Sequence, residues 1–184
     1  ELFTVEKVHS SPARFDMKKL EAINGDKIRA LTLDDFATWT IPFLKKAGVI
    51  EGRDEEIALV MKALPLIQER IVKLDEAPAL LKFLFIKNFA VDPEAAPKIA
   101  DEPAKDILKR SLKELEVLET WSHESIEAAL RASLIEELGL KPRIAFTALR
   151  IATTGSTISP PLFESMELLG KQACLDHINS ALSL

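Results

Sequence analysis

The side chains that most often act as nucleophiles or metal ligands are few in this chain of 184 residues. Three histidines, His9, His123 and His177, lie in unrelated contexts and lack the spacing of a metal site. Cys174 and His177 are three positions apart, a spacing that places both on one face of a helix. Such a pair more often consists of a buried small residue beside a surface histidine than of a nucleophile and its base. We therefore expect no catalytic residue and no metal ligand.

Phosphate loops and paired carboxylates are equally weak candidates. Gly155-Ser156-Thr157 looks like part of a phosphate-binding loop, but no strand precedes it and no Gly-Lys-Ser/Thr ending follows. The acids Asp54-Glu55-Glu56 and Glu136-Glu137 are typical of helix ends and of a solvated surface. A small enzyme would need a pocket with converging polar groups, and the sequence offers none.

Cationic side chains give the clearest signal for binding. Residues 138–163 contain no Asp or Glu, whereas Lys141, Arg143 and Arg150 all lie within them. The net charge of −5 and the pI of about 5.4 argue against a general coat for nucleic acid, since phosphate binding rests on Lys and Arg. A local basic stripe would restrict nucleic acid to one surface of an acidic protein. The simpler interpretation is a buried helical hairpin with three solvated charges.

The composition favours a soluble helical protein. Hydrophobic residues make up 47% of the chain and charged residues 29%, with only 6 Gly and no Tyr, and the abundant Leu and Ala lose little rotamer freedom in helices. No apolar run is long enough to span a bilayer, and the single cysteine, Cys174, suits a reducing cytoplasm. The first residue is Glu1 rather than Met, so we expect an excised or processed piece, or a chain from which a tag was removed.

Apolar residues at helical spacing predict nine or ten helices, with no strand pair and no internal repeat. Thr32 and Ser122 are expected to cap helices, Gly139 and Gly155 to end them, and Asn24-Gly25 to stop the first one. The predicted helical segments are residues 15–23, 26–30, 32–48, 54–70, 75–87, 104–119, 126–138, 144–154, 160–169 and 172–182.

Some positions carry more specific expectations. Pro42 and Pro65 lie inside helical patterns and should kink them. Residues 75–87 are apolar nearly all round and should lie deep in the core, as should Trp39 and Trp121. Residues 88–103, with three prolines and several acids, are the best candidate for a linker between two subdomains.

Two stretches are more specific than periodicity. Residues 11–20 (SPARFDMKKL), followed by Asn24 and Ile28-Arg29, resemble a segment of bacterial glutamyl-tRNA synthetases that leads into the anticodon-binding region. A second, C-terminal set is similar to the ending of the same family, as are residues 70–71 and 80–83 to its central helices. In order and spacing the resemblance covers essentially the whole chain and is greatest to the actinobacterial proteins. The second set comprises residues 139–143 (GLKPR), 149–150 (LR), 154–156 (TGS), 159–164 (SPPLFE) and 168–170 (LLG).

The resemblance implies an all-α fold in which two helical subdomains form a multihelical cage around the anticodon loop. Residues 1–30 would be the end of the stem-contact region, residues 31–90 the first anticodon-binding subdomain and residues 91–184 the second. The HIGH-like and KMSKS-like motifs of the catalytic domain do not occur here. The resemblance therefore implies a piece that does not aminoacylate tRNA by itself and holds no cofactor or metal, while ATP and Mg belong to the catalytic domain of the parent enzyme.

The same resemblance assigns roles to individual residues. The arginine that reads the third anticodon base corresponds to Arg70, and a second base-reading arginine corresponds to Arg150. The pair that contacts the loop corresponds to Ser159 and Pro160. These roles suit the chemistry, because unstacked loop bases expose their edges and a guanidinium can donate paired hydrogen bonds or stack. Lys141 and Arg143 are expected to make less specific phosphate contacts. Without the resemblance, Arg70 would be expected to pair with Glu69 or Asp75 or to be solvated.

The resulting hypothesis is a cytoplasmic, monomeric tRNA-binding module of a glutamate–tRNA ligase. The partner would be the glutamate tRNA, or that tRNA and the glutamine tRNA together, a choice on which Arg70 bears without deciding it. The alternative is a helical protein–protein interaction module without RNA binding, which would present an exposed apolar patch.

Overall fold

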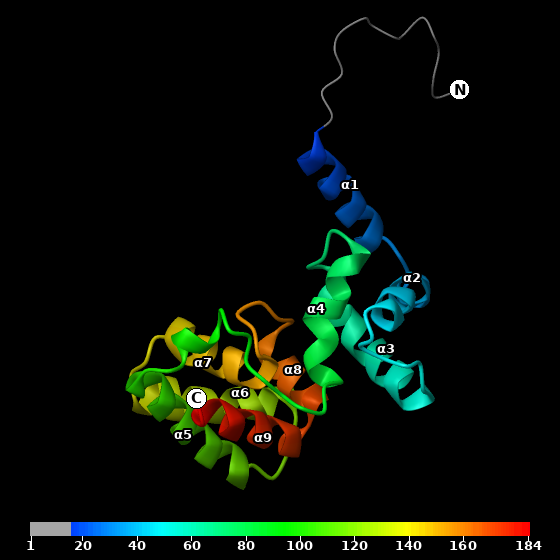
Figure 1. Cartoon of the computed structure of the whole chain (residues 1–184). Helices are drawn as coiled ribbons and strands as arrows, with labels where there is room; N and C mark the ends of the chain where they lie inside the picture. Colours follow the sequence, from blue (N-terminus) through cyan, green and yellow to red (C-terminus); the bar gives the residue numbers. More distant parts are fainter. Residues whose placement is uncertain (1–15) are drawn as a thin grey trace, which may run out of the picture.

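The computed structural model describes residues 16–184, and within them every regular element is helical (Figure 1). The predicted all-α fold class is therefore confirmed for this part of the chain. None of its helices is both long and apolar enough to cross a membrane. The leading segment 1–15, with His9 and residues 11–15 of the first motif, lies outside the described residues.

The α-helices of residues 16–184 follow one another through short connections. They are α1 (Met17–Arg29), α2 (Leu33–Lys46), α3 (Asp54–Gln68), α4 (Ala77–Leu81), α5 (Glu102–Val117), α6 (His123–Arg131), α7 (Pro142–Thr154), α8 (Leu162–Leu169) and α9 (Lys171–Leu182). The shorter elements are the 3₁₀ turns η2 (Leu74–Glu76), η3 (Lys82–Leu84) and η4 (Ala96–Lys98), and the π-helical segment η5 (Ala132–Glu137).

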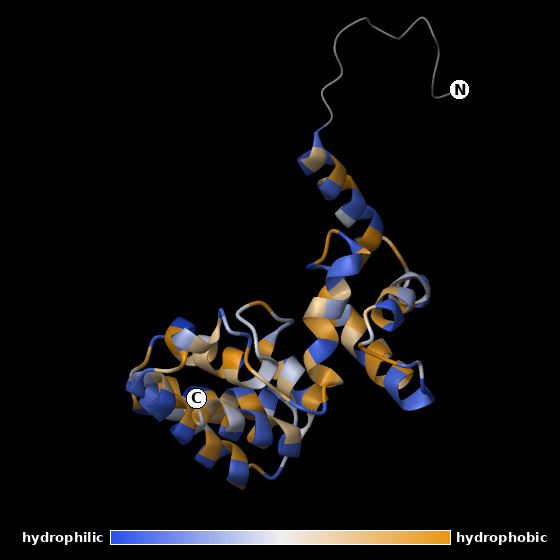
Figure 2. Ribbon diagram, viewed as in Figure 1, coloured by the Kyte–Doolittle hydropathy of each residue, from blue (hydrophilic) through white to orange (hydrophobic). Residues whose placement is uncertain are grey.

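The helices bury two separate hydrophobic cores. The first lobe, α1 to η3, packs around residues such as Phe36, Leu44 and Leu64, which are all completely buried. The second lobe, η4 to α9, packs around Leu108, Leu130 and their neighbours. In both lobes hydrophobic residues, orange in Figure 2, alternate with hydrophilic residues along the helices, as expected where one face of each helix is covered.

The two lobes touch through a small number of elements. Helix α3 of the first lobe contacts α8 of the second, and η3 contacts α7. Leu168 belongs to α8, yet its side chain packs against the core of the first lobe. Apolar burial therefore continues across the boundary between the lobes.

Local capping signals place several helix ends as expected. The hydroxyl groups of Thr32 and Ser122 accept hydrogen bonds from backbone N–H groups in the first turns of α2 and α6, at 3.2 and 3.3 Å. Gly139 and Gly155 follow their helices with φ of +65° and +79°, a left-handed conformation that glycine adopts at little steric cost.

The expected stop at Asn24-Gly25 is wrong, because α1 continues to Arg29. Gly25 is buried, and a Cβ atom at this position would lie 3.1 Å from Cγ1 of Val72. The Asn24 side-chain amide donates a hydrogen bond to the carbonyl oxygen of Val72. Here glycine serves close packing of α1 against the segment after α3, instead of ending the helix.

The single helix expected at residues 75–87 is also wrong, since the segment divides into η2, α4 and η3. Only part of it is buried, including Ala77, Leu81 and Phe83. Pro78 lies in the first turn of α4, a position that tolerates its missing N–H and marks a new helix start. By contrast, α2 and α3 continue through Pro42 and Pro65.

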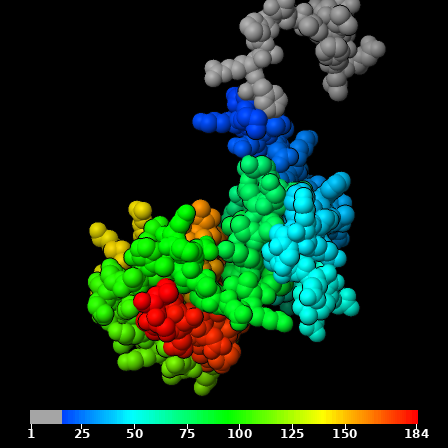
Figure 3. Space-filling model, viewed as in Figure 1, coloured from blue at the N-terminus to red at the C-terminus, as the bar shows by residue number. Residues whose placement is uncertain are grey.

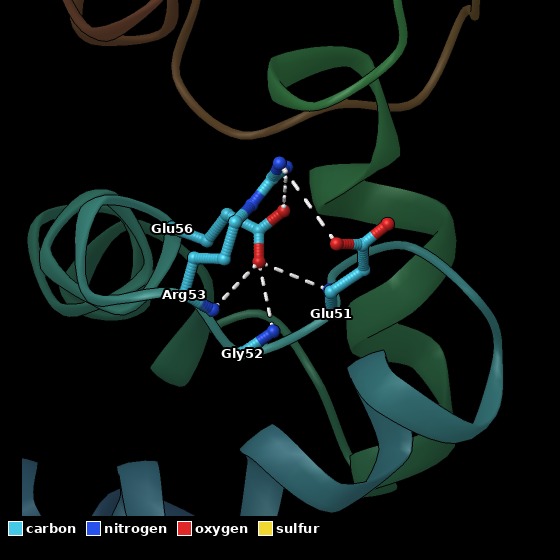
Figure 4. A network of polar contacts seen from close by, with 4 residues as sticks. All are labelled: Glu51, Gly52, Arg53 and Glu56. Carbon is cyan, nitrogen blue, oxygen red and sulfur yellow. Dashed lines mark hydrogen bonds and ion pairs between the residues drawn. The ribbon is translucent and has the colours of Figure 1, made fainter.

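The start of α3 is held by one carboxylate. Oε2 of Glu56 accepts hydrogen bonds from the backbone N–H groups of Glu51, Gly52 and Arg53 at 2.8 to 3.0 Å, and its Oε1 pairs with the Arg53 guanidinium at 2.6 Å (Figure 4). The hydrogen bond and charge of Arg53, together with the backbone donors, lower the pKa of Glu56 from 4.5 to about 2. The connection between α2 and α3 is therefore fixed by an ionised side chain.

We predict that Glu56→Gln destabilises the domain in a pH-dependent way. Because the pKa of Glu56 is lowered on folding, its contribution is complete above 4.5 and is lost as the pH falls from 4.5 toward about 2. Urea unfolding of the wild type and the variant should therefore differ at about pH 7 and converge at about pH 3. Glu55→Gln is the matched control, since Glu55 accepts no hydrogen bond within residues 16–184. A Glu56 effect no larger than that of the control would contradict this assignment.

Candidate nucleic-acid interface

Arg70 lies immediately after α3 and is exposed. It forms no ion pair with any of the residues that the structure describes, so the expected alternative of pairing with Glu69 or Asp75 is not realised there. Its backbone N–H donates to Ile67 at 2.9 Å, which fixes the main chain at this point. The guanidinium is thus anchored at its base and available at its tip.

Arg150 lies in α7 and is half-buried. Its Nη1 donates hydrogen bonds to the hydroxyl oxygen of Ser159 and, at 2.8 Å, to the carbonyl oxygen of Pro160. Its Nε and Nη2 donors make no hydrogen bond to any residue between 16 and 184. One edge of the guanidinium therefore holds the turn after α7, and the remaining donors are free for a ligand.

The two arginines, 80 positions apart in sequence, lie near each other in space. Burial lowers the pKa of Arg150, and the positive charge of Arg70 lowers it further. No acid offsets this repulsion through an ion pair with either arginine within residues 16–184. Two like charges held together in this way favour an anionic or electron-rich ligand between the lobes.

A hollow of about 600 Å³ opens at this point between the lobes. Arg70, Ala79 and Leu80 line it from the first lobe, and Ile158 and Ser159 from the second. Figure 3 shows the orange atoms that follow α7 beside the green atoms of the α4 region. The hollow combines apolar walls with a guanidinium and a hydroxyl group, which suits a flat polar ring such as a nucleobase.

The other residues expected at the site are placed less directly. Ser159 and Pro160 are both buried, so they present a small edge to the hollow instead of a free surface. Lys141 and Arg143 are exposed, but they lie at the opposite end of α7. That helix has 13 residues and is about 20 Å long. The structure thus joins Arg70, Arg150 and Ser159, and leaves Lys141 and Arg143 apart from them.

The turn after α7 is held against the segment that follows η3. The backbone N–H of Asp92 donates to the carbonyl oxygen of Gly155 at 2.8 Å. A Cβ atom on Gly155 would lie 3.0 Å from the carbonyl oxygen of Ala90. Phe89 stacks on His177 with ring centroids 3.8 Å apart. These contacts place the Ser156 to Pro160 turn beside Arg150.

His177 is buried, so the expectation of a surface histidine beside Cys174 is wrong. Its Nδ1 lies 2.7 Å from the carbonyl oxygen of Thr153 at the end of α7, and burial lowers its pKa. Cys174 is buried as expected, and burial raises the pKa of its thiol. A protonated thiol under a neutral, stacked imidazole has a structural role.

His123 contacts Glu167 at 2.8 Å and Glu124 at 3.1 Å, and these acids raise its pKa. No group of His, Cys, Asp and Glu in residues 16–184 could hold a metal ion. The titratable side chains of this region therefore serve helix contacts, in contrast to the arginines at the hollow.

Trp39 was expected in the core, but 59% of its surface is exposed. It lines a separate hollow of about 440 Å³ with Phe43 and Leu74. Its apolar neighbours at helical spacing suggested burial, and the sequence contains no signal that this face of α2 lies at the edge of the first lobe. Trp121, half-buried, packs against the second core, and its Nε1 donates to Met166 at 3.1 Å.

Comparison with known proteins agrees with this geometry. A family model described as an anticodon binding domain matches residues 35–182. The chain belongs to this family. Relatives of the anticodon-binding domain include the glutamate–tRNA ligases of Saccharopolyspora erythraea, 45% identical over 185 residues, and Rhodococcus jostii, 46% identical over 181 residues. These alignments cover 99% and 97% of this chain but only 37% of each ligase, so the chain spans little more than a third of their length.

Solved structures confirm the fold. The domain matches a glutamate–tRNA ligase from Elizabethkingia meningosepticum with a TM-score of 0.76 and 22% identity, over 98% of this chain and 35% of that one. A glutamate–tRNA synthetase from Elizabethkingia anophelis matches with a TM-score of 0.74 and 22% identity, over 99% and 34%. The predicted family and multihelical architecture are thereby confirmed.

We predict that Gly155→Ala destabilises the domain more than Gly139→Ala. Both glycines have positive φ, which costs an alanine about 1–2 kcal/mol. At Gly139 nothing lies within 4 Å of the added Cβ, whereas at Gly155 the Ala90 carbonyl lies at 3.0 Å, and such overpacking adds about 1–3 kcal/mol. The free energy of unfolding in urea measures both. Equal losses would show that the close approach of Ala90 to the turn is not a constraint.

Proposed function

We propose that this domain recognises the anticodon loop of a tRNA and that its parent protein is a glutamate–tRNA ligase. The observation that carries the proposal is the convergence of Arg70 and Arg150 on one hollow between the lobes. Membership of the anticodon-binding domain family supports it, as do the names of relatives that are 45% and 46% identical to the chain. Unpaired loop bases expose the edges and faces that such a hollow can hold.

Arg70 is the proposed reader of the third anticodon base. It is exposed, its backbone is fixed, and it lies at the rim of an apolar hollow. A planar guanidinium can pair with a base edge through two parallel hydrogen bonds or stack on its face. The apolar walls contributed by Ala79 and Leu80 would cover the base and reduce competition from water.

Arg150 has a double role in this proposal. One edge holds Ser159 and Pro160, so the turn is formed before RNA arrives and less side-chain ordering is left for binding. The Nε and Nη2 donors would contact a second base, and the first base would lie against the Ser159-Pro160 turn. Lys141 and Arg143 are proposed to contact phosphates away from the bases.

The preferred partner is the glutamate tRNA, and pairing of Arg70 with the third base would decide whether the glutamine tRNA is also accepted. The parent reaction would be the attachment of glutamate to tRNA with ATP and Mg. It would take place in the cytoplasm in a monomeric enzyme, through the part of the relatives that this chain does not cover. The domain itself would contribute recognition without a cofactor.

The alternative of a protein-binding module rests on a different surface. Met17, Leu20 and Ile23 of α1 are 57%, 46% and 48% exposed and lie at helical spacing. Figure 1 shows α1 extending away from the second lobe. A protein contact there would leave the arginine hollow free, so an RNA-binding assay separates the two hypotheses.

Binding of the glutamate tRNA transcript to the domain tests the proposal directly. We expect weak, salt-sensitive affinity that falls roughly tenfold or more in Arg70→Ala. The variant should also lose discrimination against a transcript with an altered third anticodon base, whereas Lys62→Ala, an exposed cation on the same helix α3, should change neither. Absence of tRNA binding would refute the proposed function, and unchanged discrimination would refute the role of Arg70.

Arg150→Ala tests the second arginine. It removes both the turn contacts and the free donors, so we expect a loss of affinity at least as large as that of Ser159→Ala, which removes only one turn contact. Filter binding of the same transcript measures both variants. Affinity unchanged by Arg150→Ala would contradict the assignment.

A further inference from the structure

Three hollows of the molecule share lining residues and therefore form one groove. The hollow between the lobes shares Asp92 and Ser156 with a second hollow of about 450 Å³. The second hollow shares Lys98 with a third of about 430 Å³, which Arg143 and Thr147 also line. The groove thus leads from the base-sized hollow at one end of α7 to Arg143 at its other end.

The groove has a fixed wall on each side. Helix α7 and the turn after it form one wall, and the segment from Asp92 to Ala104 forms the other. The hydrogen bond from Asp92 N–H to the Gly155 carbonyl closes the two walls together at 2.8 Å. With 13 residues in α7, the groove is about 20 Å long, which is enough for several nucleotides of a single strand.

The cations of the groove are available and most of its acids are not. Arg70, Lys98 and Arg143 are exposed and form no ion pair with residues 16–184. The acids at the same places are occupied: Glu76 accepts from Val72 N–H at 3.3 Å, Asp92 pairs with Lys82 at 3.1 Å, and Asp101 accepts from Ala104 N–H at 3.1 Å.

Glu94 is the exception, since it lines the second hollow without an ion pair or hydrogen bond to its side chain in the described residues. Hydroxyl groups also line the route, from Ser156 and Thr157 in the second hollow and Thr147 in the third. Available cations interspersed with hydroxyl donors match the sugar–phosphate backbone of a single RNA strand.

We infer that the groove along α7 carries the backbone of the strand that leaves the base-binding hollow, and that Lys98 contacts its phosphates at the midpoint. This inference rests on the proposed function, because the strand enters from the anticodon site. It adds a binding residue from the segment between the lobes and gives Arg143 a continuous path to the arginine hollow. Lys141 lines none of the three hollows and is not part of this path.

The test is tRNA binding by Lys98→Ala, with Lys113→Ala as the matched control. Lys113 is an exposed lysine of the same lobe that lines none of the three hollows. A phosphate contact predicts that Lys98→Ala weakens binding equally for transcripts with the correct and the altered anticodon. It also predicts that the slope of log affinity against log salt becomes shallower by about 0.7 to 1. The control should leave both quantities unchanged.

A charge change of opposite sign gives an independent test. Asp92→Asn keeps the backbone contact to Gly155 but removes the negative charge that pairs with Lys82. It should therefore tighten binding, by up to about fivefold. Asp106→Asn is the control, since Asp106 also pairs with a lysine, Lys109, at 3.5 Å but lines none of the hollows.

The outcomes separate the groove from the proposed function. If the wild type binds and Arg70→Ala weakens binding, but Lys98→Ala and Asp92→Asn behave like their controls, the groove is refuted and the anticodon site stands. If the wild type fails to bind tRNA, the proposed function fails first. Circular dichroism of each variant ensures that only folded proteins are compared.

Discussion

The hydrogen bond from the backbone N–H of Asp92 to the carbonyl oxygen of Gly155 joins the segment that leaves the first lobe to the end of α7. Stacking of Phe89 on His177 and the ion pair of Lys82 with Asp92 act on the same short segment. Because Gly155 has no side chain, the segment can approach the turn closely. The position of Ser159 and of Arg150, and the width of the hollow shared with Arg70, follow from this contact.

The electrostatics of the domain depend on which acids are occupied. The chain is acidic overall, yet the acids along α7 mostly accept hydrogen bonds or form ion pairs within the protein, and the cations there do not. Net charge governs long-range repulsion, whereas binding depends on charges that are free to contact a ligand. An acidic domain can therefore present a surface suited to RNA without being a basic protein.

Local rules predicted those features that are decided locally. The caps at Thr32 and Ser122 and the glycines after η5 and α7 were predictable, because each satisfies backbone groups a few residues away. Gly25 was misread, since its reason is the distant Val72. The exposure of Trp39 and the burial of His177 also depend on packing between helices, which periodicity on one helix does not reveal.

The candidate site divides in the same way. The family resemblance selected Arg70, Arg150, Ser159 and Pro160, but their proximity comes from the docking of the two lobes. Lys82, Asp92 and Lys98 lie in or beside a stretch that the sequence marked only as a linker. Their arrangement depends on where that stretch packs, for which the sequence carries no short-range signal.

Leu168 gives the boundary between the lobes a further property. Its helix belongs to one lobe while its side chain packs in the other, so any hinge opening would expose apolar surface to water at a free-energy cost. The spacing between Arg70 and Ser159 is therefore resistant to breathing. A ligand must fit a gap of set width, so selection by this domain operates as a rigid gauge, in which a loop of the wrong shape is rejected by steric mismatch before any base is read.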